Sequence, residues 1–464
     1  MFAYFKREPG FYRRLLSLAL PMVVQNIITN SLGLIDTFMV GTLGEGPLAG
    51  VTLANIPVFV VQLIMFGAQS GSSVLISQYW GKGDREAINR VMGIGAYVMS
   101  AIALAFALIT TFLPHQFMSL FGNDPEVIAT AAAYVRIVGW SYFFDSFVQI
   151  YIGAHRSMGN PTRGMYILVA SMVSNTFLNW VMIFGKLGFP RMEAEGAALA
   201  TLIARIISFT IMVVWALRDK VFTINWKALF CPGREMSRRF ARVAVPVMCN
   251  ETFWSLGTSM YPTIMGHMDG SKEILAAYAI AGNINNLCTV GVFAIAGAAA
   301  ILVGQEIGAG NSSRVKSLGG LLDALAFLFG LVMGLISLGL LHLFVRPVLY
   351  PVFDLSPEAA SICTMMLTVV FLTMSVRSFC TTNIVGVLRG GGDVTMAALI
   401  DILPLWVMAI PAAALCGLVL KLDVLWVYLA MAGEGVVKCL LGHLRYRTGK
   451  WIRDVTVAVE GAEV

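Results

Sequence analysis

The chain has 464 residues, of which 58% are hydrophobic and only 12% are charged. Soluble domains carry about 25% charged residues. The composition therefore argues against a soluble enzyme, a nucleic-acid-binding protein and a disordered chain. The formal net charge is +6, and its placement along the chain indicates membrane topology and not an anionic partner.

The apolar residues lie in long runs, and residues 46–81, 91–123 and 274–305 contain no Asp, Glu, Lys or Arg. A helix needs about 20 apolar residues to cross the hydrocarbon core, and these runs lack the alternation of barrel strands. The first stretch, residues 15–35, is too long for a signal-peptide core. The sequence predicts an all-α membrane protein with twelve spans. They are residues 15–41, 50–79, 91–113, 127–153, 164–185, 194–216, 242–267, 275–305, 318–345, 358–388, 394–418 and 424–444.

The lysines and arginines predict the orientation of these spans. Of the 32 Lys and Arg residues, 23 lie in the N-terminal segment, in alternate connections, in the link at residues 217–241 with Arg242 directly after it, and in the C-terminal tail. The connections on the opposite side hold only five. Basic residues gather on the cytoplasmic side. We therefore expect a multi-pass protein of the cell membrane with both termini in the cytoplasm.

The second half of the sequence repeats the first. Shared residues recur in the same order at offsets of 225 to 233 residues. The matched pairs include Pro21 with Pro246, Gln78 with Gln305, Gly83 with Gly310, Arg156 with Arg389 and Gly159 with Gly392. Each half holds six spans, so both copies enter the membrane in the same orientation, which implies a pseudo-two-fold axis along the membrane normal. The predicted domains are an N-terminal lobe (1–216), an inter-lobe linker (217–241), a C-terminal lobe (242–444) and a tail (445–464). A cleft between rocking lobes would open alternately to each side.

Several separated motifs resemble those of multidrug and toxic compound extrusion (MATE) transporters. The first lobe carries "LSLALPMVVQNIITNSLGLIDTFMVGTLG" and "LAGVTLANI", and the second carries "LVGQEIGAGN" and "GVLRGGGDVT". The resemblance covers residues 12 to 445. It implies a twelve-helix antiporter that exports organic, mostly cationic compounds by alternating access in exchange for Na⁺ or H⁺.

Polar residues at membrane depth are candidates for cation coupling, because such groups usually face a wet cavity or a partner. In the family, the Asp of "DTFMVG" has this role, and here it is Asp36. Asn175 and Asn179 lie one helical turn apart in a predicted span, so both can face one site. The family pattern often has an acid where Asn179 stands. An amide cannot carry a proton, but Asp36, Asn175 and Asn179 form a possible Na⁺ site. Hydrogen bonding between helices is the alternative role for all three.

The second lobe offers Glu251 and Asp401 as further cation-coupling candidates. Glu251 resembles the seventh-helix glutamate of Na⁺-coupled and eukaryotic relatives. Asp401 matches Asn175 in the internal repeat at an offset of 226, and a salt bridge to Arg377 is its alternative role. Glu434 and Lys438 have the i, i+4 spacing of a neutralised structural pair.

Two other functions remain as alternatives. A lipid-linked oligosaccharide flippase of the same superfamily has a similar repeat, but typically carries more cationic residues in its cleft. An intramembrane enzyme is not expected, because no HExxH, GxSxG or paired catalytic aspartate motif occurs. We expect a monomer in contact with membrane lipids, with no cofactor besides the transported Na⁺ or H⁺ and no nucleic-acid partner.

Overall fold

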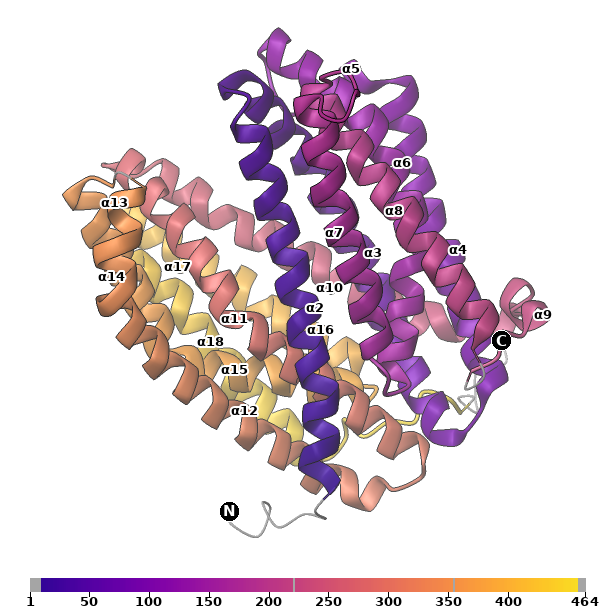
Figure 1. Ribbon diagram of the computed structural model, residues 1–464. Coiled ribbons are helices and arrows are strands. Elements are labelled where there is room, and N and C mark those ends of the chain that lie inside the picture. Colours follow the sequence, from indigo (N-terminus) through magenta and orange to yellow (C-terminus); the bar gives the residue numbers. More distant parts are fainter. Residues whose placement is uncertain (1–9, 220–221, 354, 458–464) are drawn as a thin grey trace. The chain divides into compact units, whose positions relative to one another are not determined.

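The computed structural model describes residues 10–219, 222–353 and 355–457 and is almost entirely helical (Figure 1). Across these ranges the chain forms no β-strand, and a single antiparallel bridge joins Gly392 to Ile452. The predicted all-α class is confirmed. Three basic residues of the orientation argument, Lys6, Arg7 and Lys220, lie outside the described residues.

The first repeat is built from six long helices and two short ones. They are α2 (Gly10–Gly41), α3 (Glu45–Lys82), α4 (Arg85–Phe112), α5 (Pro114–Met118), α6 (Pro125–Ser157), α7 (Thr162–Phe184), α8 (Glu193–Arg218) and α9 (Trp226–Phe230). Aspartates begin two of the long helices. Asp84 accepts a hydrogen bond from the N–H of Ala87, and Asp124 accepts from the N–H groups of Glu126 and Val127. These caps satisfy backbone donors that have no partner inside the helix.

The second repeat contains α-helices interrupted by π-helical segments, written η. The elements are α10 (Arg234–Gly266), α11 (Ser271–Gly308), α12 (Ser312–Leu340), η1 (Leu341–Leu349), α13 (Tyr350–Val352), α14 (Pro357–Leu372), α15 (Met374–Thr381), η2 (Thr382–Leu388), α16 (Val394–Leu403), η3 (Pro404–Ala409), α17 (Ile410–Ala414), η4 (Leu415–Val419) and α18 (Val424–Thr448). Proline lies in two of these segments, at positions 347 and 404. Proline lacks the backbone N–H that an α-helix interior requires.

Ten of the described helices are long and apolar enough to cross a membrane, and a pair bent by 53° at residue 373 makes an eleventh span. The twelfth predicted span, residues 242–267, corresponds to α10. This helix has 33 residues but is not among the helices that meet the same criterion, and polar residues such as Asn250 and Glu251 lie inside it. The twelve-helix layout predicted from the sequence therefore matches the helices observed.

The helices form two compact units. One contains residues Val24–Met248, and the other contains Met1–Val23 and Cys249–Val464. The division falls inside α2 and inside α10. We call them the N-terminal and C-terminal units. The lobe, linker and tail boundaries predicted from the sequence stay a prediction.

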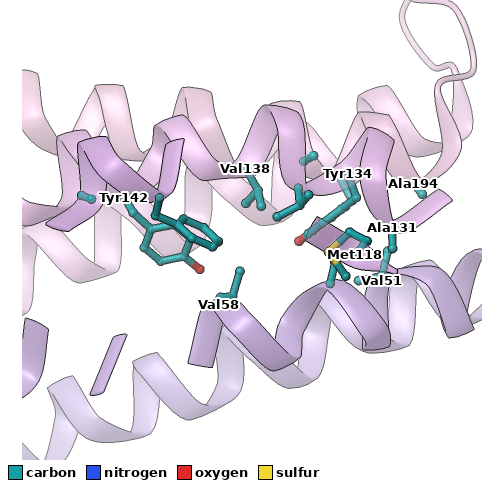
Figure 2. Close-up of a cluster of buried hydrophobic side chains, with 14 of the residues drawn as sticks. Val51, Val58, Met118, Ala131, Tyr134, Val138, Tyr142 and Ala194 are labelled. Carbon is teal, nitrogen blue, oxygen red and sulfur yellow. The ribbon is translucent and has the colours of Figure 1, made fainter. Parts of the chain in front are cut away.

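The core of the N-terminal unit lies where α6 packs against α3 and α4. Figure 2 shows Tyr134 and Tyr142, both from α6, within a cluster that includes Val51 and Val58 of α3. The Tyr142 hydroxyl accepts a hydrogen bond from Gln62 at 3.1 Å. Since a buried hydroxyl without a partner is costly, this bond lets the ring enter the core.

Matched residues of the repeat adopt the same backbone conformation in both units. Helices α3 and α11 each have 38 residues. The glycines that follow them, Gly83 and Gly310, have φ angles of 77° and 81°. Gly159 and Gly392 both have a φ of 91°. Only glycine adopts this region without strain, so shared turn geometry explains why these glycines recur.

Candidate functional site

Asp36, Asn175 and Asn179 come together in the N-terminal unit, where α2 meets α7. The Asn179 side-chain amide donates to Asp36 Oδ1 at 2.6 Å and to Asn175 Oδ1 at 3.2 Å. Asn175 donates in turn to the hydroxyl of Thr201 on α8 at 3.2 Å. The two asparagines are buried, and Asp36 is partly exposed. The predicted set of three residues thus shares one hydrogen-bonded cluster.

An ion pair adjoins this cluster. Arg205 of α8 contacts Asp145 of α6 with an N–O distance of 2.9 Å, and Arg205 also acts electrostatically on Asp36. Two carboxylates and one guanidinium leave an excess of negative charge when both acids are ionised. A cation added beside Asp36 would neutralise it.

The donor atoms of the cluster fit a monovalent cation. Asn179 Oδ1 is buried and has no hydrogen-bond partner, although a buried acceptor is normally satisfied. A carboxylate, a side-chain carbonyl and a hydroxyl are oxygen ligands of the kind that hard cations prefer. Asp36 would supply the charge and Asn175 and Asn179 the neutral oxygens, while the carboxylate alone can take a proton.

An apolar groove of about 560 Å³ lies on the same two helices, and none of the three cluster residues is among those that line it. Its lining residues are Ile35, Met39, Met172, Val173, Thr176, Phe177 and Trp180. Asp36 lies between two of them in sequence, and Asn175 and Asn179 each lie beside one. The cluster and a groove that contains two aromatic and two methionine side chains thus share α2 and α7.

In the C-terminal unit, Asp401 lies in a buried network. Its Oδ1 contacts Lys438 Nζ at 2.7 Å, and its Oδ2 accepts from Asn250 at 3.1 Å. Lys438 also forms the predicted ion pair with Glu434. Arg377, the alternative partner expected from the sequence, donates instead to Asn285 at 2.9 Å. Lys438 therefore neutralises both Asp401 and Glu434. The i, i+4 spacing predicted only the contact with Glu434.

Glu251 has a different partner. Its Oε1 contacts Arg389 Nη1 at 2.8 Å, so neighbouring Asn250 and Glu251 do not share a partner. The N-terminal unit has a related contact, in which Arg156 donates to Gln25 Oε1 at 2.6 Å. Arg156 and Arg389 are repeat partners, and Gln25 corresponds to Asn250. In each unit this arginine ties the start of a loop to the first helix.

Sequence reasoning missed Asp323. This carboxylate is only 4% exposed and accepts a hydrogen bond from the Asn383 amide at 2.7 Å. Asp323 lies inside the predicted span 318–345, and the rule that singled out Asp36 applies to it equally. Its partner is 60 residues away, so only the tertiary structure brings the two together.

Comparison with known proteins places the chain among membrane transporters. The MatE family model matches residues 21–181 and 245–415. A "Probable multidrug resistance protein NorM" of Thermotoga maritima is 25% identical over 453 residues, which cover 97% of this chain and 96% of the relative.

Solved structures share the fold. A MOP superfamily transporter from Pyrococcus furiosus superposes with a TM-score of 0.84 at 21% identity, covering 96% of each chain. A MATE structure in complex with MaL6 superposes with a TM-score of 0.83 at 22% identity, covering 94% of this chain and 96% of that one.

Proposed function

The chain belongs to the MatE family of membrane multidrug efflux transporters, and we propose that it is a secondary active antiporter. In this proposal it exports organic, mostly cationic drugs or metabolites in exchange for Na⁺ or H⁺ by alternating access. The observation that carries the proposal is the hydrogen-bonded cluster of Asp36, Asn175 and Asn179, which shares α2 and α7 with an apolar groove.

The cluster supports cationic cargo through charge. Near it, Arg205 pairs with Asp145 and acts electrostatically on Asp36, so one guanidinium stands against two carboxylates. A site with excess negative charge in a medium of low dielectric attracts positive charge more strongly than the same charges in water.

The groove supports a lipophilic cargo. Phe177 and Trp180 are 53% and 43% exposed, so their rings can receive a flat cation. Cation–π contacts contribute about 0.5–2 kcal/mol, and methionine adapts to irregular shapes. Met39 and Met172 lie in the same lining. The combination suits varied organic cations better than one specific substrate.

Asp36 is the proposed coupling residue of this site. Antiport requires that the coupling ion bind one conformation more tightly than the other. A carboxylate that is exposed in one state and neutralised by H⁺ or Na⁺ in the other provides this difference. Glu251 and Asp401 are secondary candidates, because Arg389 and Lys438 already neutralise them in this conformation.

The rest of the assignment is part of the same proposal. The protein acts as a transporter and not as an enzyme, needs no resident cofactor and functions as a monomer among membrane lipids with both termini in the cytoplasm. The flippase alternative is not favoured, because the Thermotoga maritima relative is named for multidrug resistance and the cluster is acidic.

Dye export from proteoliposomes tests this function. Vesicles are loaded with a fluorescent lipophilic cation, and Na⁺ and pH gradients are imposed separately. We expect export under one of the two gradients, with little export of an anionic analogue of similar size. Equal export of both analogues, or no response to either gradient, would refute cation antiport.

A further inference from the structure

Asp323 differs from every other buried acid in the described part of the chain. Four aspartates are fully buried there, namely Asp145, Asp219, Asp323 and Asp393. Three contact arginine. Asp145 pairs with Arg205, Asp219 with Arg163, and Asp393 with Arg445 and Arg453. Asp323 contacts the neutral amide of Asn383 instead.

The surroundings of Asp323 are apolar and tightly packed. The adjacent Leu322 is fully buried, as are Ile384 and Val387 beside Asn383. Burying an ionised carboxylate without a counter-ion costs several kcal/mol, so such a group normally neutralises. An ionised Asp323 does not fit this environment.

The hydrogen bonds between Asp323 and Asn383 are incomplete. Asn383 donates to Asp323 Oδ2, while Asp323 Oδ1 and Asn383 Oδ1 are both buried without a partner. A carboxylic acid facing a carboxamide can form two antiparallel hydrogen bonds, one in each direction. A single proton on Asp323 Oδ1, donated to Asn383 Oδ1, would satisfy both atoms.

No cation on the neighbouring helices, within the described residues, replaces that proton. Arg377 bonds to Asn285, Lys438 to Asp401 and Glu434, Arg389 to Glu251, and Arg445 to Asp393. Charged residues of α11, α14 and α12 lie near the ends of these helices, and they are Lys272, Glu273, Glu306, Glu358, Arg314 and Lys316. In η1 the exposed Arg346 contacts His342, and Arg447 lies in the last turn of α18. On α18, His443 stacks on Tyr446. Cys439 carries no positive charge in either protonation state, so it cannot balance a carboxylate.

Asn383 lies in the π-helical segment η2, at a point where α18 leaves room for it. A side chain at Gly442 would place its Cβ 2.5 Å from Asn383 Oδ1, so glycine is needed there. The buried hydroxyls of Ser378 and Thr382, near Asn383 in sequence, also lack partners. π-helical segments are frequent at functional sites.

We propose that Asp323 and Asn383 form a proton-binding site in the C-terminal unit, and that the proton held there in this conformation is released during the transport cycle. The carboxylate takes up the proton to form the neutral acid, and release restores the carboxylate and frees the proton to water. This inference rests on the proposed antiport and adds a site to it. A proton suits the pair better than Na⁺, because the Asn383 N–H₂ group already occupies one carboxylate oxygen.

Infrared spectroscopy of the full-length protein in lipid nanodiscs tests the site directly. The carbonyl stretch of a protonated carboxyl group is resolved from that of an ionised one. We expect the wild type to show this band and Asp323→Asn to lose it, while the exposed control Glu358→Gln keeps it. In Asn383→Ala the band should remain but shift, because the acid loses its hydrogen-bond partner. The last variant keeps the test valid if Asp323→Asn does not fold.

Export by the same variants in proteoliposomes tests the role of the proton. Asp323→Asn should lose the response to a pH gradient by about tenfold, a typical coupling between two sites, and Glu358→Gln should not. If Asp323→Asn keeps the band unchanged, Asp323 is not the protonated group and the proposed site is wrong. If Na⁺ removes the band of the wild type, the site binds Na⁺ and not a proton. If Asp323→Asn loses the band but keeps its pH-driven export, the proton at Asp323 has no role in transport. The spectrum needs no cargo, so it decides the site even if the wild type exports no dye.

Discussion

Asp36 combines partial exposure with a direct bond to a buried amide. The Asn179 amide donates to it at 2.6 Å, so a small movement of α2 against α7 would change what the carboxylate contacts. Because amides stand at positions 175 and 179, Asp36 is the member of the three-residue cluster whose side chain could take up a proton. A residue of this kind can report the conformation of the unit through its protonation or ion binding.

We expect Asp36→Asn to abolish gradient-driven export while leaving the protein folded. The amide keeps the shape of the carboxylate and can still bond to Asn179, so the cluster is preserved, but it neither takes up a proton nor attracts Na⁺ as strongly. Dye efflux at matched protein levels measures the loss. Thr37→Val is the control, since it removes an exposed hydroxyl of the same helix that bonds to the Gly33 carbonyl outside the cluster. Wild-type efflux by Asp36→Asn under either gradient would contradict the assignment.

Lys438 is the central residue of the second network, because it balances both Asp401 and Glu434. We expect Lys438→Met to destabilise the protein by about 3–5 kcal/mol, since it leaves two acids in a low dielectric without a counter-ion. Asp401→Asn should cost less, because Lys438 keeps Glu434. Thermal unfolding in detergent measures both. The exposed Lys272→Met serves as the control, and equal melting temperatures for all three variants would show that the network carries no stability.

Helical spacing paired residues that lie close in sequence, whereas the distant grouping of Asp36 with Asn175 and Asn179 followed from the family resemblance. Asn175 and Asn179 could be placed on one face from their spacing, and Glu434 and Lys438 could be paired in the same way. The bonds from Arg205 to Asp145 and from Lys438 to Asp401 depend on how helices pack. That packing cannot be read from periodicity in helices that are apolar on nearly every face. Glu251 was predicted as a cation ligand, and whether it binds one beside Arg389 stays open to test.

At the scale of elements, the two units share a set of contacts. In each unit, the chain that follows the sixth long helix contacts the connection between the fourth and fifth long helices. In the N-terminal unit, Asp219 follows α8 and contacts Arg163 and His155. In the C-terminal unit, the chain after α18 contacts Asp393 and Gly391 through Arg453. Related contacts at matched places in the repeat indicate a shared structural requirement at this end of each unit.

Arg163→Ala should destabilise the N-terminal unit by about 3–5 kcal/mol, because it leaves the buried Asp219 carboxylate without its main counter-ion. The exposed pair of Arg90 and Glu86 provides the control. Arg90→Ala should cost under about 1 kcal/mol, as exposed ion pairs do. Chemical unfolding followed by tryptophan fluorescence compares the two. Similar losses for both variants would mean that Arg163 has no special role in holding the loop.

In the C-terminal unit, the side chain of Trp451 also holds the chain after α18 in place. The ring is fully buried, stacks on Tyr446 at a centroid distance of 5.8 Å and donates through Nε1 to the Tyr446 carbonyl at 3.0 Å. We expect Trp451→Ala to cost about 3–5 kcal/mol, the range for large aromatic truncations in cores. Trp426→Ala, at a ring that is 54% exposed, is the control. A melting temperature for Trp451→Ala no lower than that of the control would refute the anchoring role.

At the scale of the whole molecule, the internal repeat and the distribution of basic residues are consistent with each other. Matched glycines with matched φ angles show that the two halves adopt similar folds, as the repeat of sequence motifs predicted. The exception is α10, which does not meet the apolar criterion that the other spans meet. The arginines in its first turns continue the basic linker, and they support the assignment of that linker to the cytoplasm.

The orientation in the membrane is the last expectation to test. The linker at residues 217–241 and both termini should face the cytoplasm, because 23 of the 32 basic residues lie on that side of the predicted topology. A cysteine introduced at Gly233, in a background without the seven native cysteines, should resist a membrane-impermeant thiol reagent in intact cells and react after permeabilisation. Gly233 has open space where a Cβ would lie, but its φ is 83°, so the exposed neighbour Arg234→Cys provides a second, unstrained position. A cysteine at Lys421, in the connection between the last two predicted spans, should show the opposite pattern. Labelling at the linker but not at Lys421 in intact cells would invert the topology, and with it the direction of transport inferred for every site described above.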